Sequence, residues 1–421
     1  MKKSLVALAV ASIAGAAFAQ SSVTVYGIVD TGYSNYSNDA PTGKVRQSGL
    51  SSSNTITSRL GFRGVEDLGG GLKAKFNLEM GISTDDGAGQ ITTNTGNVQG
   101  AGSAAGSLVF SRLAYVGLES SLGEIRLGRD IHPGYYNYVV FDPFGAVGAA
   151  ASLPSVQMFD SFISTGGHIR FSNGINYFLP SNLGGVYGQL AYAPSEVSSN
   201  SVATLGASAA APIGTLAKGD GESYGARIGY AAGPLNVALG YAVVKASIVQ
   251  FGSVAPVGAS NDRETINLAG TYDFGVAKLW GQLARLDVDN YANRVGNVTN
   301  KSAMIGVTVP VGPHLFKASY AQAENGGSQA LTNQWETKKL GLGYEYRLSK
   351  RTAFYTSAAI VDNKNGGRIG VGAISTTNGN FQNAQTASGL SQPNGGVGAG
   401  GGAVAADGKS RGIDIGLRHA F

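Results

Sequence analysis

The sequence predicts an all-β fold: a transmembrane 16-stranded antiparallel β-barrel with short periplasmic turns, long extracellular loops and an inward-folded third loop. The clearest observation is the last segment, residues 412–421, where Ile413, Ile415 and Leu417 alternate with small or polar residues before the terminal Phe421. A lipid-facing barrel strand requires this alternation. Beyond the N-terminus, no segment has the ~18 uninterrupted apolar residues of a spanning helix, so strands must cross the membrane.

The N-terminus has the features of a secretory signal. Lys2 and Lys3 precede a mostly apolar run over residues 5–17, and Ala17-Phe18-Ala19 is a typical cleavage site. We therefore expect residues 1–19 to be removed and residues 20–421 to form a single outer-membrane barrel domain. Loss of the two lysines lowers the formal net charge from +5 to +3.

The strand pattern is cleanest over residues 72–80, where Leu72, Phe76 and Met80 share one face and Lys75 and Glu79 share the other. Alternation alone fits a soluble sheet as well as a barrel, so the number and spacing of such segments decide between them. We predict sixteen strands, near residues 22–34, 57–65, 72–81, 108–119, 124–130, 167–178, 185–193, 222–231, 235–245, 263–272, 276–286, 301–310, 314–322, 337–347, 352–362 and 412–421.

The connections alternate between short and long. Tight turns are expected at residues 66–71, 120–123, 180–185, 231–234, 273–275, 310–313 and 349–351. Long loops are expected at about 35–56, 82–107, 131–166, 194–221, 246–262, 287–300, 323–336 and 363–411. This asymmetry is typical of outer-membrane barrels, in which the short turns are periplasmic. An even number of strands then places both chain ends on the short-turn side.

The third loop differs from the others in composition. Most long loops are rich in Gly, Ser, Asn and Ala, whereas residues 131–166 are rich in aromatic and apolar side chains. Such a loop needs a surface to pack against, and in a wide barrel that surface is the lumen wall.

The composition excludes several classes of protein. The chain has no cysteine, which suits passage through an oxidising compartment without a disulfide framework. Its basic residues are scattered rather than clustered, which argues against a nucleic-acid partner. The four histidines lie far apart in sequence, so neither a metal site nor any other cofactor is expected. Pairs of acids at Asp85-Asp86 and at Asp287 with Asp289 suit Ca²⁺ or solvated loop charge, and we favour solvated charge.

At this point the chain resembles a known family. Residues 58–74 (SRLGFRGVEDLGGGLKA), 123–129 (GEIRLGR), 348–352 (LSKRT) and 418–421 (RHAF) resemble the Gram-negative general porins, specifically their β-proteobacterial branch. The resemblance covers the whole mature chain. It implies a homotrimer of barrels in contact with outer-membrane lipid and lipopolysaccharide, each with a water-filled channel narrowed by the third loop. It also implies that Phe421 is the signal read by the barrel-assembly machinery.

The resemblance further implies which residues line the pore constriction, where wall arginines face carboxylates on the inward loop. The matching wall positions are Arg59, Arg112, Arg129 and Arg170, with Arg63 as a further candidate, and the loop carboxylates are Asp142 and Asp160. A charge facing lipid at mid-membrane costs roughly 2–4 kcal/mol, which favours the lumen for strand arginines. Alternation places Arg59 and Arg63 opposite Leu60 and Phe62, and Arg112 opposite Leu113 and Tyr115.

Two of these assignments have alternatives. Strict alternation over residues 124–129 places Arg129 with Ile125 and Leu127 and turns Arg126 to the lumen, unless a bulge at Gly128 shifts the register. Asp142, which precedes Pro143, is either a pore carboxylate or the cap of a turn.

The favoured function is a channel for passive diffusion of small ions and hydrophilic solutes, with weak to moderate anion preference. An enzyme is not expected: residues 221–225 (GESYG) match a hydrolase motif but lead into a strand, and residues 396–401 (GVGAGG) match a nucleotide motif inside a low-complexity loop. The remaining alternative is a barrel that acts mainly as an adhesin or receptor through its extracellular loops.

Overall fold

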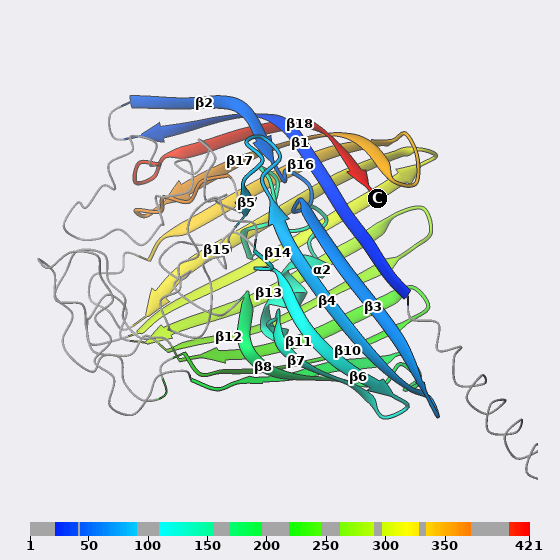
Figure 1. Cartoon of the computed structure of the whole chain (residues 1–421). Helices are drawn as coiled ribbons and strands as arrows, with labels where there is room; N and C mark the ends of the chain where they lie inside the picture. Colours follow the sequence, from blue (N-terminus) through cyan, green and yellow to red (C-terminus); the bar gives the residue numbers. More distant parts are fainter. Residues whose placement is uncertain are drawn as a thin grey trace, which may run out of the picture.

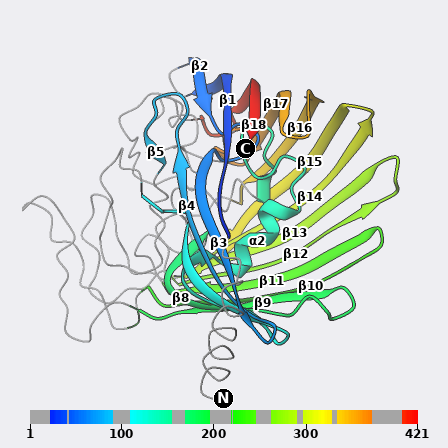
Figure 2. The same ribbon diagram turned by 45° about the vertical axis from the view of Figure 1, so that its right-hand side comes forward.

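The protein is described by a computed structural model over residues 22–40, 43–90, 109–154, 169–195, 219, 221–245, 262–289, 297–327, 334–371 and 404–421. Long tilted strands enclose an interior that contains the short helix α2 (Figures 1 and 2). The strands are β1 Ser22–Ala40, β2 Gly43–Ser52, β3 Arg59–Gly69, β4 Leu72–Ile82, β5 Gly89–Gln90, β6 Leu113–Ser120, β7 Gly123–Ile131, β8 Arg170–Phe178, β9 Val186–Ala193, β10 Ser223–Ala232, β11 Leu235–Val244, β12 Arg263–Asp273, β13 Lys278–Asp289, β14 Asn297–Val311, β15 His314–Gly327, β16 Glu336–Arg347, β17 Thr352–Lys364 and β18 Lys409–Ala420, and α2 is Pro133–Val140. Within the described ranges, no helix is both long and apolar enough to cross a membrane.

The strands form one closed antiparallel sheet. β1 pairs with β18 from Ile28 opposite Ala420 onward, and it pairs with β3 on its other side. The structure has eighteen strands, but β2 and β3 are two parts of one broken wall strand and β5 is a two-residue bridge, so sixteen strands close the barrel. The predicted sixteen-stranded barrel is therefore confirmed.

The barrel wall is apolar outside and polar inside. In β18, Ile413, Ile415 and Leu417 are exposed, whereas Asp414 between them is fully buried. The same alternation of exposed and buried residues recurs along β11, β12 and β14. Exposed aromatic side chains also gather near the periplasmic strand ends, at Tyr230, Tyr272, Phe274, Phe316, Tyr346, Phe354 and Phe421. These features match a lipid-facing band with an interfacial aromatic girdle.

The prediction of a long loop over residues 35–56 is wrong. β1 continues to Ala40, and β2 returns along it with Thr31 opposite Ser52. This hairpin is rich in Ser, Asn and Gly and lacks apolar alternation because it extends beyond the lipid, where backbone pairing needs no apolar face. β14, β15 and β18 also extend three or more residues beyond their predicted extracellular ends, for the same reason.

The break between β2 and β3 bends inward onto a buried acid. One carboxylate oxygen of Asp30 accepts hydrogen bonds from the backbone N–H groups of Thr55 and Ile56 at 2.8 and 2.9 Å. Its other oxygen accepts one from the Tyr355 hydroxyl. The first connection is therefore tied to the inner wall by charge-assisted hydrogen bonds.

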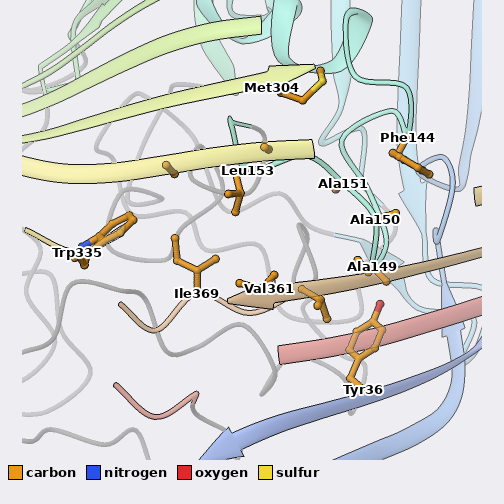
Figure 3. Close-up of a cluster of buried hydrophobic side chains, with 14 residues drawn as sticks. Tyr36, Phe144, Ala149, Ala150, Ala151, Leu153, Met304, Trp335, Val361 and Ile369 are labelled. Carbon is orange, nitrogen blue, oxygen red and sulfur yellow. The ribbon is translucent and has the colours of Figure 1, made fainter. Parts of the chain in front are cut away.

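The described part of the third loop lies inside the barrel and forms its largest apolar cluster. Phe144, the three alanines at 149–151 and Leu153 pack against inward residues of the wall, including Met304 and Val361 (Figure 3). The predicted inward-folded third loop is therefore confirmed over this stretch. Residues 155–168, which include Asp160, lie outside the described residues.

Polar contacts also hold the loop at the seam of the barrel, where β1 pairs with β18. Asp414 on β18 accepts hydrogen bonds from the Ala149 N–H at 2.7 Å and from the Ser34 hydroxyl at 2.6 Å. Gly148 has φ +72°, and a Cβ there would lie 2.0 Å from the carbonyl oxygen of Asn54. The loop thus reaches the wall only because residue 148 has no side chain.

We expect Gly148→Ala to lower the thermal unfolding temperature of the purified protein, measured by circular dichroism. A left-handed alanine costs about 1–2 kcal/mol, and overpacking costs about 1–3 kcal/mol more. The matched control is Gly70→Ala, since Gly70 has φ +60° but a Cβ there would meet nothing within 4 Å. Equal shifts for the two variants would contradict the close approach.

Candidate pore constriction

The helix α2 carries the first part of the third loop along the inner wall. His132 caps its N-terminus. Asn267 on β12 holds the helix, since its side chain accepts a hydrogen bond from Asn137 Nδ2 at 2.6 Å and donates one to the Gly134 carbonyl at 2.7 Å. A Cβ at position 134 would lie 2.5 Å from that of Ala242, so glycine permits this close packing.

Two tyrosines of α2 are buried and neutral near pH 7. The Tyr138 hydroxyl hydrogen-bonds with Thr265 Oγ1 at 3.0 Å, and burial raises the pKa of Tyr138 to about 12. Burial also raises the pKa of Tyr135, against the opposing effect of the nearby Arg170 and Arg112. The helix therefore presents polar but uncharged hydroxyls, and Tyr135 lies beside the wall arginines.

Asp142 follows the helix and is only 3% exposed. One of its oxygens accepts a hydrogen bond from the Phe144 N–H at 2.8 Å, and the other accepts bonds from the Ser152 N–H and hydroxyl at 2.9 and 2.8 Å. The Asp142 carboxylate therefore caps the turn that follows α2, which is one of its two predicted roles. Its role as a pore carboxylate stays a prediction.

Two of the arginines predicted for the constriction contact one acid on β4, and the other two lie close to this pair. Glu79 Oε1 lies 2.6 Å from Arg112 Nε and 3.8 Å from Arg59 Nη1. Arg170 interacts electrostatically with Arg112, Arg129 and Glu79. Arg129 is fixed by hydrogen bonds to the Ser111 carbonyl at 2.6 Å and the Ser172 hydroxyl at 2.7 Å. We name Arg59, Arg112, Arg129, Arg170 and Glu79 the arginine cluster.

A β-bulge resolves the alternatives for Arg126 and Arg129. Gly128 has φ +127°, and the register of β7 against β8 shifts between Gly128 and Asp130. Ile125 and Leu127 stay on the exposed face, while Arg126 and Arg129 both turn to the other. The predicted bulge at Gly128 therefore lets both Arg126 and Arg129 lie on the inner face of the strand.

The periodicity argument for Arg112 is wrong, although its side chain does point into the barrel. On β6, Val116 and Leu118 are the exposed residues, and Tyr115 contacts Arg126 inside the barrel. Strict alternation would send Arg112 outward with Val116. It reaches Glu79 because β6 begins at Leu113 and the chain bends just before it.

Two other predicted residues, Arg63 and Phe421, lie apart from the arginine cluster. Arg63 is exposed, four residues nearer the periplasm than Arg59 on the same strand, with its guanidinium 5.2 Å from the Tyr26 ring centre. Phe421 follows β18, and its backbone exchanges hydrogen bonds with Gly27 at 3.0 and 3.1 Å.

In the described part of the chain, no three His, Cys, Asp or Glu side chains group as metal ligands.

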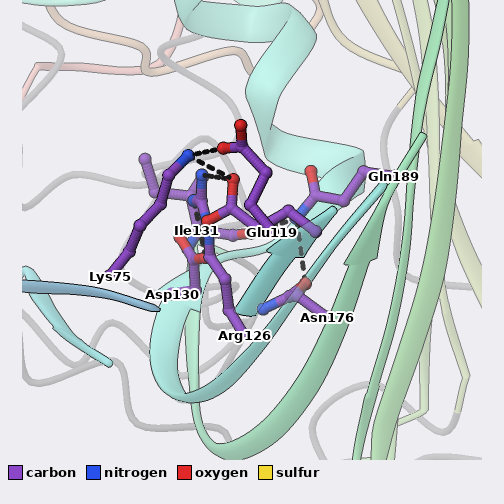
Figure 4. Close-up of polar contacts among 8 residues, drawn as sticks. Lys75, Glu119, Arg126, Asp130, Ile131, Asn176 and Gln189 are labelled. Carbon is purple, nitrogen blue, oxygen red and sulfur yellow. Dashed lines mark hydrogen bonds and ion pairs between the residues drawn. The ribbon is translucent and has the colours of Figure 1, made fainter. Parts of the chain in front are cut away.

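A second charged cluster, nearer the periplasm, was not predicted as a unit (Figure 4). Lys75 contacts Glu119 and lies 3.3 Å from Glu124, and Arg126 bonds Glu124 at 2.6 Å and Asp130 at 3.1 Å. Strand alternation did place Lys75 on the water side. The pairing across β4, β6 and β7 was not predictable because it depends on register and on the bulge.

Arg227 on β10 is a further lumen arginine that the sequence analysis missed. Its guanidinium lies between the rings of Tyr136 and Tyr187, at 5.2 and 4.7 Å, and its Nε donates to Asn137 Oδ1 at 2.6 Å. The inward position follows from alternation with exposed Ile228, which was the available signal. Its contact with α2 was not predictable from local sequence.

Comparison with known proteins gives a consistent result. The profile of the Gram-negative porin family matches residues 4–366. Outer membrane porin protein 32 of Delftia acidovorans is 36% identical over 422 residues, which cover 100% of both chains. The solved anion-selective porin from Comamonas acidovorans is 32% identical with a TM-score of 0.71, over 96% of this chain and 100% of that one. The trimer form of OmpT from Vibrio cholerae shares the fold, with a TM-score of 0.59 and 14% identity over 95% of this chain and 99% of that one.

We expect Glu79→Gln to destabilise the protein, because it leaves the buried Arg112 and the partly buried Arg59 beside each other without their shared acid. Removing one partner of a buried ion pair costs about 3–5 kcal/mol, and water in the lumen reduces this to about 1–3 kcal/mol. The thermal unfolding temperature should fall. Glu324→Gln is the control, since Glu324 is an exposed acid on the outer wall. Equal stability of wild type and Glu79→Gln would contradict this role.

Proposed function

Because the chain belongs to the Gram-negative porin family, we propose that its channel prefers anions and that the arginine cluster lines the constriction setting this preference. The protein is an outer-membrane porin with the closed barrel of that family. Solutes and ions cross such a barrel by passive diffusion, and charged side chains at its narrow part select among them. No enzyme activity forms part of the proposal.

The observation that carries the proposal is the charge balance within the arginine cluster. Arg59 and Arg112 share a single contacting acid, Glu79, and Arg170 and Arg129 add two further positive charges. Asp142 is the one acidic residue between positions 132 and 154, and its oxygens are bound within its own loop. The cluster therefore keeps a positive balance, which lowers the energy of an entering anion.

The second cluster does not oppose this field strongly. It combines two cations, Lys75 and Arg126, with three acids, Glu119, Glu124 and Asp130, so its balance is close to neutral. The Comamonas porin is described as anion-selective. At 32% identity over nearly the whole chain, that neighbour supports the same preference here.

We also propose that Phe421 is the signal read by the barrel-assembly machinery, and that the barrel contacts outer-membrane lipid and lipopolysaccharide. The Phe421 ring covers Gly27 at the periplasmic end of the seam and remains 46% exposed, so it is accessible from that side. No observation on the described residues favours the adhesin or receptor alternative.

We expect a reversal potential of anion-selective sign in a KCl gradient at about 0.1 M, where the Debye length is about 10 Å. Arg59→Gln combined with Arg170→Gln should shift it toward cations, because two charges of the arginine cluster are lost. Salt of about 1 M should flatten the preference, since the Debye length falls to about 3 Å.

The control for this experiment is Lys350→Gln with Arg351→Gln, which removes two charges from an exposed periplasmic turn. That variant should keep the wild-type reversal potential. Cation selectivity of the wild type at 0.1 M, or an unchanged potential in the Arg59/Arg170 variant, would refute the assignment.

We further expect a homotrimer. The Vibrio cholerae neighbour of the same fold has a trimer form, and the exposed apolar wall of one barrel gives ample area for contact with two others. Unheated protein should migrate as a trimer in SDS electrophoresis and collapse to monomer on heating. A monomeric mass in mild detergent, measured by native mass spectrometry, would contradict this expectation.

A further inference from the structure

Arg227 on β10 is a lumen cation that no acid of the described residues contacts. Its guanidinium is half-buried between the rings of Tyr136 and Tyr187, at 5.2 and 4.7 Å from their centres. The groups that act on it electrostatically are these two tyrosines. The inward side chains around it are also neutral: Tyr187 and Gln189 on β9, Asn236 and Ala238 on β11, and Tyr136 and Asn137 on α2.

The acids beyond this neutral shell are already paired with other arginines. Asp130 and Glu79 act electrostatically on Tyr136, which covers one face of the guanidinium. Asp130 lies 3.1 Å from Arg126 Nη1, and Glu79 belongs to the arginine cluster. The charge of Arg227 therefore stays uncompensated in the lumen.

The contacts of Arg227 leave the outer edge of its guanidinium open. Nε donates to Asn137 Oδ1 at 2.6 Å, and Nη2 lies 3.4 Å from the Tyr187 hydroxyl oxygen. A guanidinium has further N–H donors, and no other described residue accepts from this one. Its two terminal amino groups lie side by side, which matches the paired oxygens of a carboxylate or phosphate.

The guanidinium extends from the third loop toward the periplasmic mouth of the barrel. Asn137 on α2 holds one side of it. Tyr187 on its other side stands opposite Gly229, which is nearer than Arg227 to the periplasmic end of β10. A Cβ at Gly229 would lie 2.3 Å from the Tyr187 ring, so glycine lets the ring lie flat on the wall. A solute that has passed the third loop can therefore reach Arg227.

A second arginine of the lumen has the same aromatic surroundings but is paired with acids. The guanidinium of Arg126 on β7 lies 4.5 Å from the Tyr115 ring centre and 4.1 Å from that of Phe178. It also bonds two acids, of which Glu124 is the closer at 2.6 Å. The rings hold a guanidinium in both places, and only at Arg227 is the position of the acid left open.

We propose that Arg227, Tyr136 and Tyr187 form an oxyanion site of the channel, which binds the carboxylate or phosphate group of a passing solute. Two oxygens of the solute accept hydrogen bonds from Nη1 and Nη2, while the rings and Asn137 fix the plane of the guanidinium. The arginine cluster sets the preference for anions over cations. Arg227 discriminates among anions, because a halide ion has no paired oxygens.

The experiment records the ionic current through the purified full-length porin in planar bilayers at about 0.1 M KCl, where charges are weakly screened. The probes are acetate, inorganic phosphate and, as a monatomic anion, bromide. The measured quantity is the half-blocking concentration, at which a probe causes half of its maximal decrease in current.

The two test variants change Arg227 alone. Arg227→Lys keeps the charge and loses the paired amino groups, whereas Arg227→Gln loses both. The matched control is Arg126→Lys, which makes the same change in a guanidinium that also lies against two rings but is paired with acids. Circular dichroism of each variant checks that the barrel has folded.

Arg227→Gln should raise the half-blocking concentration of acetate or phosphate about tenfold, since a charge-assisted pair of hydrogen bonds is lost. Arg227→Lys should raise it about threefold, because an ammonium group keeps the charge but cannot present two parallel N–H groups. The probe that blocks at the lower concentration identifies the group that the site prefers. Arg126→Lys should match the wild type. Arg227→Lys should also keep the wild-type reversal potential in a KCl gradient, whatever its sign, which separates this result from the test of the arginine cluster.

Equal half-blocking concentrations in the wild type and in Arg227→Gln would overturn the proposal. An equal loss of block in Arg126→Lys would do the same, since it would show a general effect of lumen arginines. Bromide block that weakens in Arg227→Lys as much as acetate block would show that paired oxygens are not recognised. A changed conductance of Arg227→Lys at about 1 M KCl, with unchanged block, would show that Arg227 only positions the third loop.

Discussion

The structure depends on satisfying every backbone polar group inside lipid, where no water is present to replace a missing partner. A sheet meets this requirement only if it closes, and closure occurs where β1 pairs with β18 on one side and with β3 on the other. This explains why β1 is the longest strand, with 19 residues, and why it needs two partners in succession on one edge, β3 and then β2. The outer face of the closed sheet then has to be apolar, and the inner face can carry polar and charged side chains.

The wide interior created by closure is occupied by chain from the loops. Buried acids organise that chain: Asp30 holds the break between β2 and β3, and Asp414 holds the third loop. Small residues permit the contacts, as at Gly134 and Gly148. Because α2 and the following residues pack on the inner faces of β9 to β18, we propose that the arginine cluster on the opposite strands faces the solute path.

The sequence predicted the wall strands and the inward fold of the third loop, whereas the contacts between side chains inside the lumen were not predictable. Period-two alternation identified all sixteen wall strands because lipid imposes it on each strand separately. It did not show the β1–β2 hairpin, which lies outside lipid. It also placed Tyr115 on the lipid face, although Tyr115 contacts Arg126 inside the barrel. The four cluster arginines came from family resemblance, whereas the contacts of Arg59 and Arg112 with Glu79 depend on pairing across β3, β4 and β6. The contact of Arg227 with Asn137 was not predictable, because the two residues are 90 positions apart in the sequence.

The tether of the third loop has a consequence for how the barrel is made. Ala149 donates to Asp414, 265 residues further along the chain, on the last strand to be synthesised. Gly148 also packs on Asn54, near the first strand. The loop therefore gains its final fixed position only after the two ends of the chain have met. Before that point Gly148 and Ala149 lack these two contacts, so we expect closure of the wall and the final width of the pore to be set in one step of assembly.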